Sequence, residues 1–153
     1  MTEPAIQRLY LDDLAVGACF HSGTYRVDAD EIRQFARQYD PQPFHLDDEA
    51  ARDTLFGGLA ASGWHTAAIT MRLLVDGGLP LAGGVVGAGT EITWPRPVRA
   101  GDELHVETTV MEIVPSRSKP DRAIVLCRSD TLNQHGERVQ RSDARLVVFR
   151  RPA

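Results

Sequence analysis

The second half of the chain is rich in long apolar segments of the kind that form β-strands. These segments run over residues 85–96, 103–114, 122–133 and 138–150. Glycine-containing turns at 99–102 and 133–137 separate two pairs of them, and the polar stretch 114–121 makes a longer connection. Because short turns join neighbouring strands that run in opposite directions, this succession predicts an antiparallel sheet.

The first half of the chain changes its pattern several times. Residues 1–17 are typical of an N-terminal arm, and residues 18–27 of a strand. Asp28 or Asp30 then begins a helix as its N-cap. The apolar stripe of this helix consists of Ile32, Phe35, Ala36 and Tyr39. The helix must end before Pro41, because the residue preceding a proline is pushed out of the α region.

Two further helices are predicted before the strands begin. A short one over 47–58 starts at an aspartate and ends at glycines, and a longer one over 61–78 has Ser62 as its N-cap. The apolar positions of the longer helix are Ala67, Ala68, Met71, Leu74 and Val75. Its small, mostly apolar first turns indicate a helix that is buried on several sides. The element order predicts a single α+β domain over 1–153, in which an antiparallel sheet packs on one long central helix.

Composition narrows the classes of function. The chain has 153 residues, 42% of them hydrophobic, which is enough for one domain with a substantial core. The net charge is −4 and no segment gathers a basic face, so a nucleic-acid partner is excluded. The basic residues Arg117, Lys119 and Arg122 are suited to a single local phosphate instead.

Cysteine usage and the N-terminus bear on the compartment. Cys19 and Cys127 both lie in apolar, strand-like segments, so we expect two buried free thiols in a reducing compartment. The N-terminus has no basic stretch followed by an apolar core, and no apolar run reaches the ~18 residues of a membrane span. We therefore expect a cytoplasmic protein with no membrane partner.

The segment DPQPFHLD, residues 40–47, contains the first candidate for chemistry. A histidine beside a carboxylate can hold a water molecule and move its protons near neutral pH. We expect Asp40 at a helix C-terminus and His45 in an extended loop. Pro41 and Pro43 stiffen that loop, and acid–base chemistry needs such fixed geometry.

Two other interpretations of this segment stay open. In the first, Asp40 caps a turn and His45 is an ordinary hydrogen-bonded loop histidine. A metal site is the other alternative, and its ligands would be His45, Asp47, Asp48 and Asp40 with His65.

The pair Ser62-Gly63 is the second candidate. A glycine in the first turn of a buried helix leaves backbone N–H groups free and lets a ligand approach closely. Such groups stabilise a developing oxyanion. The alternative is plain helix capping by Ser62 with a small residue for close packing; Trp64 and His65 read most simply as packing residues.

The segment FARQYDPQPFHLDDEAARDTLFGGLAASGWHTAAITMRLL, residues 35–74, resembles the hydratase 2 segment of MaoC-like dehydratases, the R-specific enoyl-CoA hydratases. The matching positions are Asp40, Pro41, Pro43, Phe44, His45, Asp47, Phe56 and Gly63. The stretch TWPRPVRAGDEL, residues 93–104, is similar to the strand-turn-strand that follows the central helix in that family. The resemblance covers about residues 15–150.

The resemblance implies a hot-dog fold, a long helix wrapped by an antiparallel sheet, paired into homodimers or larger assemblies. It makes Asp40 and His45 the catalytic dyad and the Gly63 amide the oxyanion donor. Many family members have His-Gly-Met or His-Gly-Leu at the helix start. Here the sequence is Ser62-Gly63-Trp64, which keeps the amide donor but places Trp64 near the acyl pocket and alters the expected chain-length preference.

The implied reaction is reversible addition of water to a trans-2-enoyl-CoA, which gives a (3R)-3-hydroxyacyl-CoA. An acyl-CoA is then the substrate and binding partner, and neither a metal nor a redox cofactor is required. Ser62 and Trp64 are expected to contact the substrate, and Arg96, Arg117 and Lys119 are candidates to bind the phosphates of CoA.

Three alternative functions stay open. A hot-dog thioesterase hydrolyses the same class of acyl-CoA, and a catalytically silent module binds it without turnover. A dehydratase for branched, dicarboxylic or ring-bearing acyl-CoA uses the same residues with another pocket.

Overall fold

The computed structural model describes residue 2 and residues 4–153; residues 1 and 3 of the predicted arm lie outside the described residues. The helices are α1 (Ala29–Tyr39), α2 (Pro43–Leu46), α3 (Asp48–Ala51) and α4 (Gly63–Leu73), with a 3₁₀ turn at Leu11–Asp13 and a π-helical turn at Leu74–Gly78. The strands are β1 (Cys19–His21), β2 (Tyr25–Arg26), β3 (Val86–Thr93), β4 (Glu103–Pro115), β5 (Arg122–Leu132) and β6 (Arg138–Phe149).

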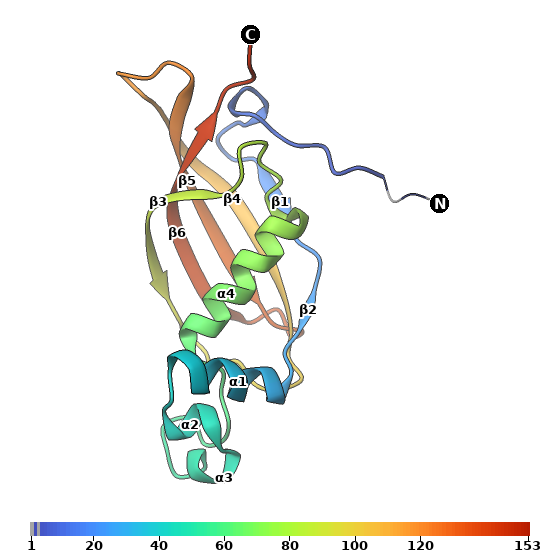
Figure 1. The fold of residues 1–153 in the computed structure, drawn as a ribbon, viewed down its shortest axis with the longest axis vertical. Coiled ribbons are helices and arrows are strands. Elements are labelled where there is room, and N and C mark those ends of the chain that lie inside the picture. The colour runs from blue at the N-terminus through green and yellow to red at the C-terminus, as the bar shows by residue number, and fades with distance from the viewer. Residues whose placement is uncertain (1, 3) are drawn as a thin grey trace.

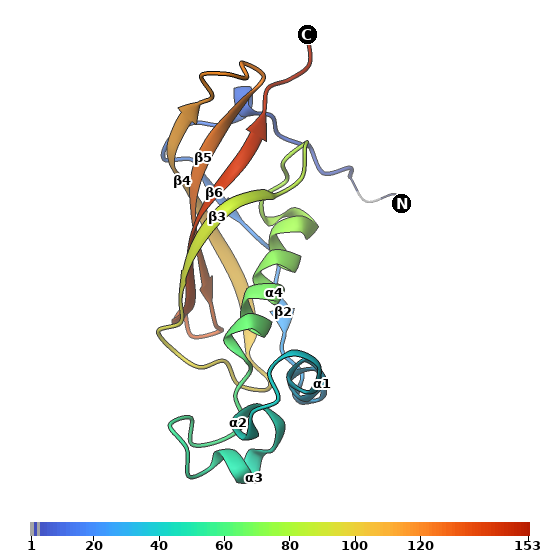
Figure 2. The same ribbon diagram turned by 60° about the vertical axis from the view of Figure 1, so that its left-hand side comes forward.

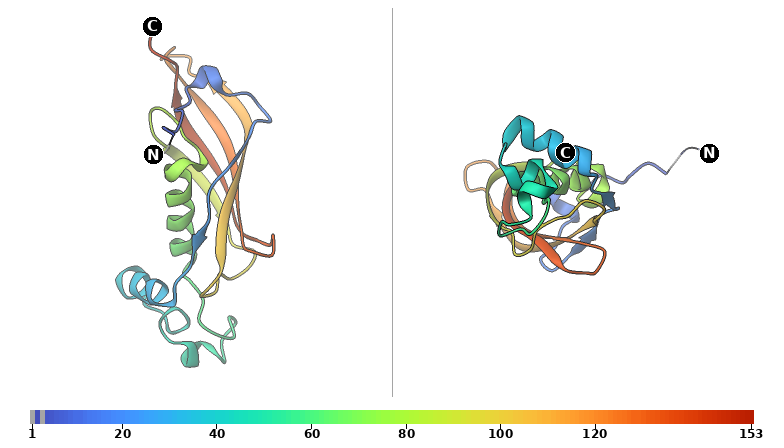
Figure 3. Two further views of the ribbon diagram at one scale, coloured as in Figure 1. Left: turned by 90° about the vertical axis from the view of Figure 1, so that its right-hand side faces the viewer. Right: turned by 90° about the horizontal axis from the view of Figure 1, so that it is seen from below.

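The strands form one antiparallel sheet in the order β1-β4-β5-β6-β3, and β2 pairs with β4 beside β1. The sheet is curved, and α4 lies against its inner face (Figures 1 and 2). Figure 3 shows the same relation from the side and from below, where the strands curl around the helix. The predicted α+β class is confirmed, and a helix wrapped by a curled antiparallel sheet is the hot-dog arrangement that the resemblance implies.

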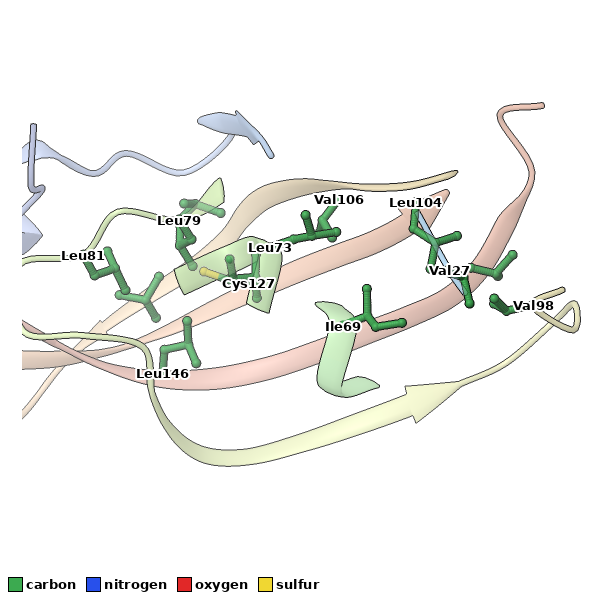
Figure 4. Close-up of a cluster of buried hydrophobic side chains, with 14 of the residues drawn as sticks. Val27, Ile69, Leu73, Leu79, Leu81, Val98, Leu104, Val106, Cys127 and Leu146 are labelled. Atoms are coloured by element: carbon green, nitrogen blue, oxygen red, sulfur yellow. The ribbon is translucent and has the colours of Figure 1, made fainter. Parts of the chain in front are cut away.

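The core lies between α4 and the sheet. Along β5 every second residue is buried, as expected for a strand with one face on the core. Leu104 and Val106 from β4 and Ile69 and Leu73 from α4 pack in the same cluster, which Figure 4 shows in close-up. In this half of the molecule, the apolar positions that alternate in the sequence are therefore the buried ones.

The prediction of one continuous strand over 18–27 is wrong: the structure has two short strands there, β1 and β2. Between them, Ser22 bonds the same residue of β4 twice. Its N–H donates to the Val106 carbonyl at 2.9 Å, and its Oγ accepts from the Val106 N–H at 2.7 Å. The Ser22 hydroxyl thus accepts the Val106 N–H, which in a regular β-ladder would donate to a backbone carbonyl.

Both predicted helices near the centre are shorter than expected. The helix over 47–58 is confined to α3, and turns follow it. The helix over 61–78 keeps α-helical geometry only to Leu73 and continues as the π-helical turn. Gly77 there has a φ of 137°, a conformation that ends a helix and suits glycine.

The two cysteines differ in their surroundings. Cys127 is buried in the core, and burial raises the pKa of its thiol to about 11. Cys19 is exposed, so the expectation that both thiols are buried is wrong for Cys19. Its strand, β1, is short and lies at the edge of the sheet, which leaves this side chain toward solvent.

Residues 29–61, which we call the end cap, gather at the N-terminal end of α4. The cap contains α1, α2 and α3 and lies below the sheet in the view of Figure 1. None of the helices in the described part of the chain is both long and apolar enough to span a lipid bilayer.

Candidate active site

Asp40 stands where α1 ends. Its N–H still donates to the Ala36 carbonyl at 2.8 Å, but the next residue is Pro41 and the helix does not continue. The prediction of a carboxylate at this helix C-terminus is confirmed.

His45 does not lie in an extended loop as predicted. It lies in α2, a single helical turn whose first residue is Pro43. Proline is well suited to that position, since its φ is already helical and its missing N–H has no role there. The turn carries His45 back toward the end of α1, where its side chain is buried.

The two side chains meet. His45 Nε2 lies 3.3 Å from Asp40 Oδ2, and His45 Nδ1 lies 2.7 Å from the Ala60 carbonyl oxygen. A carbonyl only accepts, so Nδ1 carries the hydrogen and donates it. In the neutral imidazole Nε2 is then an acceptor that faces a carboxylate, and a water molecule that donates one hydrogen to each satisfies both.

Ser62 joins Asp40 to the start of α4. Its Oγ donates to Asp40 Oδ2 at 2.7 Å and accepts from the Trp64 N–H at 3.3 Å as the helix N-cap. The side chain is fully buried with both bonds made inside the protein. Ser62 is therefore placed to fix the carboxylate.

The charge state of Asp40 follows from its neighbours. Burial opposes ionisation, but hydrogen bonds from Gln42 and Ser62, together with the nearby His45, outweigh it. These contacts hold the pKa of the Asp40 carboxyl below its ordinary value of 3.8. Asp40 is thus a carboxylate near neutral pH.

Gly63 begins α4 next to this pair. No described residue accepts a hydrogen bond from its N–H, which is one of the free donors at a helix start. A Cβ at this position would lie 2.7–2.9 Å from three ring carbons of Trp94. The indole therefore packs directly on the glycine, and only glycine permits that approach.

A pocket of about 490 Å³, which we call the catalytic pocket, opens at these groups. It is lined by His45, Leu55, Phe56, Ala61, Gly63, Thr66, Trp94, Pro95, Arg96, Pro97 and Val98. The lining is largely apolar, and the histidine and the helix N-terminus are among its few polar groups. Such a site is typical of binding an apolar ligand with one reacting polar centre.

One arginine holds the wall of this pocket in place. The Arg99 guanidinium donates to the carbonyls of Phe56, Gly58 and Leu59, the last two at 2.9 and 3.2 Å. Phe56 in turn packs against His45, with ring centroids 5.7 Å apart. Because the guanidinium satisfies three carbonyls, the irregular segment after α3 has a defined conformation.

The other predicted substrate-binding residues divide into two groups. Arg96 borders the catalytic pocket and pairs with Glu137 at 3.0 Å. Arg117 and Lys119 lie in the connection between β4 and β5, at the opposite end of the sheet from the end cap (Figure 1). Within one chain the structure does not bring them to the site.

Trp64 lies at the surface of α4, beside the catalytic pocket. Its side chain is 60% exposed and lies outside the lining of the catalytic pocket. It touches the pocket only through Trp94, whose ring it meets edge-on with centroids 5.4 Å apart. Trp64 therefore packs on Trp94 at the surface of α4 rather than in the core, because helical geometry turns it outward.

The residues of the alternative metal site make other contacts. Asp47 caps α3, Asp48 accepts from the Leu59 N–H at 2.9 Å, and the His65 ring stacks on Phe35 with centroids 4.8 Å apart. Among the residues that the structure describes, no three His, Cys, Asp or Glu side chains converge as metal ligands do.

Several residues of the site were missed from the sequence. The Ala60 carbonyl, the Arg99 guanidinium and the Gln140 amide that binds Trp94 carry no local signal, since their roles depend on contacts distant in sequence. Trp94 lies in the quoted segment TWPRPVRAGDEL, so the resemblance pointed to its position but not to its role.

A hot-dog fold with a carboxylate and an imidazole at the free N-terminus of its central helix defines a class of protein with an acid–base site. Residues 17–126 match the family model described as the MaoC like domain, and the chain belongs to this family. The predicted resemblance is thereby confirmed.

The chain is similar to a solved MaoC-like dehydratase from Rhodospirillum rubrum, with 71% identity, 95% of this chain and 99% of that one covered, and a TM-score of 0.94. It is also similar to the solved R-hydratase PhaJ1 from Pseudomonas aeruginosa, with 27% identity, 95% and 89% covered, and a TM-score of 0.75.

Two curated relatives match over most of their length. The uncharacterized protein YdeM of Bacillus subtilis is 33% identical, with 92% of this chain and 99% of YdeM covered. The 3-hydroxybutyryl-CoA dehydratase of Methylorubrum extorquens is 30% identical, with 88% and 84% covered.

Proposed function

We propose that the protein is a hydro-lyase that adds water reversibly to a trans-2-enoyl-CoA and forms a (3R)-3-hydroxyacyl-CoA. The observation that carries this proposal is the Asp40–His45 pair, whose Oδ2 and Nε2 atoms lie 3.3 Å apart beside the free Gly63 amide. Support also comes from relatives named as a 3-hydroxybutyryl-CoA dehydratase and an R-hydratase.

The dyad holds and deprotonates water in this proposal. A water molecule donates one hydrogen to Asp40 and one to His45 Nε2. As its oxygen bonds to C3, one hydrogen passes to the dyad, and C2 takes a proton from the dyad on the same face. One water is consumed per enoyl group, and no electron leaves the acyl group, so the step requires neither a metal nor a redox cofactor.

The Gly63 amide acts on the other end of the enoyl system. Negative charge builds on the thioester oxygen as water adds, and an N–H at a helix N-terminus stabilises it. Loss of one such donor typically costs about 3 kcal/mol of barrier. Ser62 is a positioning residue, since it orients Asp40 rather than touching the substrate.

With the enoyl group bound at the dyad, the CoA part of the substrate lies at the mouth of the catalytic pocket. Arg96 is the one predicted cation that borders this mouth, and we assign it to a CoA phosphate. Its partner Glu137 competes for it, so a phosphate must displace that ion pair.

We also propose that the chain forms a homodimer. In the described structure β3 pairs only with β6 and leaves its other edge open. Exposed apolar side chains lie beside that edge: Val86 on β3, with Trp64 and Met71 on α4. Light scattering on the purified protein, with Val86→Arg as the variant expected to dissociate it, tests this assignment.

Hydration of crotonyl-CoA tests the proposed reaction. We expect the enoyl absorbance to fall and the product mass to rise by one water. Asp40→Asn and His45→Gln are expected to lower kcat by about 10²–10⁴-fold, the usual contribution of acid–base groups. Asp30→Asn, an exposed carboxylate in the first turn of α1, is the matched control and should leave turnover unchanged.

Other outcomes identify the alternatives. Release of free CoA thiol without a hydrated product means a thioesterase. Thermal stabilisation by acyl-CoA without any turnover means a silent binding module. Full activity in both dyad variants overturns the assignment of Asp40 and His45.

A further inference from the structure

The molecule contains a second cavity next to the catalytic pocket. We call it the interior cavity; it has a volume of about 430 Å³, lies between α4 and strands β3 and β6, and opens to solvent beside exposed residues such as Met71 and Thr90. Its lining is mostly apolar and includes Met71, Leu74 and Leu146. It is large enough to hold several carbons of an acyl chain, yet it contains none of the proposed catalytic residues.

The two cavities lie one after the other along α4 and the segment that faces it. On α4, Gly63 and Thr66 line the catalytic pocket, and Thr70 on the next turn lines the interior cavity. On the facing segment, Trp94 lines the catalytic pocket and Ile92 lines the interior cavity. No residue lines both, and the side chains that meet between the two linings act as a barrier.

Trp94 and Gln140 form that barrier. Trp94 Nε1 donates to Gln140 Oε1 at 2.9 Å. Gln140 is buried and lines the interior cavity, and its Nε2 donates to Thr70 Oγ1 at 3.2 Å. Thr70 is itself bonded to Thr131 at 2.6 Å. The barrier is thus tied to α4, β5 and β6 at once.

The indole is also fixed by packing. One face lies against Gly63, close enough that a Cβ there would overlap the ring, and Trp64 meets it edge-on. To swing aside, Trp94 must break its bond to Gln140 and leave a buried amide oxygen without a donor, which is unfavourable. The indole, although 41% exposed, is therefore held in place in the resting structure.

We propose that Trp94, held by Gln140, ends the acyl site at the catalytic pocket and restricts the enzyme to short-chain enoyl-CoA substrates. This inference rests on the proposed function and names its substrate class. Trp94 is the specificity-determining residue, and Gln140 is a positioning residue that acts through it. A longer tail has to enter the interior cavity and meets the indole first.

Comparison of chain lengths tests the proposal. The measured quantity is the ratio of kcat/KM for trans-2-octenoyl-CoA to that for crotonyl-CoA. In the wild type we expect a ratio below about 0.1, because even one methylene that does not fit a hydrophobic pocket typically costs about 10–200-fold. Trp94→Leu is expected to raise the ratio at least about tenfold by joining the two cavities.

Gln140→Leu tests the tether separately, since it keeps the volume but removes the acceptor. It should raise the ratio in the same direction, by less than Trp94→Leu. Met111→Ala, on a side chain 41% exposed that lines neither cavity, is the control and should leave the ratio unchanged. The ratio is insensitive to a uniform loss of folded enzyme, which affects both substrates equally.

The outcomes separate this inference from the proposed function. Wild-type ratios near 1, or no change in Trp94→Leu, overturn the barrier while hydration of crotonyl-CoA still stands. If no enoyl-CoA is hydrated, the proposed function fails. The barrier is then judged by calorimetric binding of butyryl-CoA and octanoyl-CoA. Tighter binding of octanoyl-CoA in Trp94→Leu alone supports it, and equal or absent binding in both proteins overturns it.

Discussion

Two regions of the molecule, the sheet layer with α4 and the end cap, are held together by different interactions. The sheet layer consists of strands of up to 13 residues whose buried positions alternate, and its contacts are mainly apolar. The end cap has two helices of only 4 residues each, which Asp47 separates, followed by turns, and bonds from side chains such as Arg99 hold its carbonyls. The first region contains most of the apolar core, and the second contains both groups of the proposed acid–base pair.

The two regions meet at the start of α4, and the candidate site lies there. Asp40 and His45 come from the end cap, whereas Gly63 and Trp94 belong to the helix and the sheet layer. Ser62 links them through its bond to Asp40. Substitutions on either side of this boundary should therefore separate loss of stability from loss of activity.

The largest effect on stability is expected in the sheet layer. Leu104→Ala removes a fully buried side chain and should lower the free energy of unfolding by about 2–5 kcal/mol. Urea denaturation measures the loss. Leu55→Ala in the end cap, on a side chain 97% exposed, is the matched control and should change it by less than about 0.5 kcal/mol. Equal losses of unfolding free energy in Leu104→Ala and Leu55→Ala would contradict the assignment of stability to the sheet layer.

Gly63→Ala acts on the boundary itself. The new Cβ would overlap Trp94 at 2.7–2.9 Å, and such overpacking typically costs about 1–3 kcal/mol. We also expect a lower kcat, because the indole and the oxyanion donor shift together. Adding Trp94→Leu should restore stability, and Gly23→Ala, whose Cβ has no atom within 4 Å, should show no such loss. A Gly63→Ala protein with unchanged stability would exclude the contact.

Ser62→Ala should cost less stability but still affect turnover. The helix loses its N-cap, worth about 1 kcal/mol, and Asp40 loses a donor. We expect a decrease in kcat together with a lower unfolding midpoint. Ser116→Ala removes a serine that accepts a backbone N–H far from the site and is the control for capping alone. If both serine variants keep wild-type kcat, Ser62 does not position Asp40.

The smallest effect concerns pH and the contact between α1 and α4. Burial of His65 lowers its pKa below the ordinary 6.5, against a weaker opposing attraction from Glu31. Below pH 6.5 the unfolded chain therefore binds a proton that the folded chain resists, and stability falls as the pH falls. In His65→Phe the midpoint of thermal unfolding should change less between pH 7.5 and pH 5.5 than it does in the wild type. An unchanged slope would show that His65 does not contribute it.

The sequence predicted the sheet layer more closely than the end cap. The strands over 103–114, 122–133 and 138–150 match β4, β5 and β6 within a residue at most boundaries, because alternation and turn glycines are local signals. The end cap lacks such signals, so the short helix α2 was predicted as an extended loop. Proline favours both conformations, and the packing of His45 against Phe44 and Phe56 decides between them.

The candidate site shows the same limit. Asp40, His45 and Gly63 were found because their spacing and residue types suit the chemistry and match a family pattern. Arg117 and Lys119 were predicted for phosphate binding on charge alone, and they lie at the other end of the sheet. Charge in a sequence does not tell which end of an antiparallel hairpin a loop occupies relative to a distant helix.

The sequence by itself determined the class of fold, the helix that carries Gly63 and the choice of Asp40 and His45 as candidate acid–base pair, because these depend on periodicity, capping and residue chemistry over short stretches. Only the tertiary structure decided how the two side chains of this pair are held and how the Trp94 indole is fixed. The bonds of His45 to Ala60, of Asp40 to Ser62 and of Trp94 to Gln140 join residues that are 15, 22 and 46 positions apart. Such contacts exist only after the chain has closed these loops, so no local pattern specifies them.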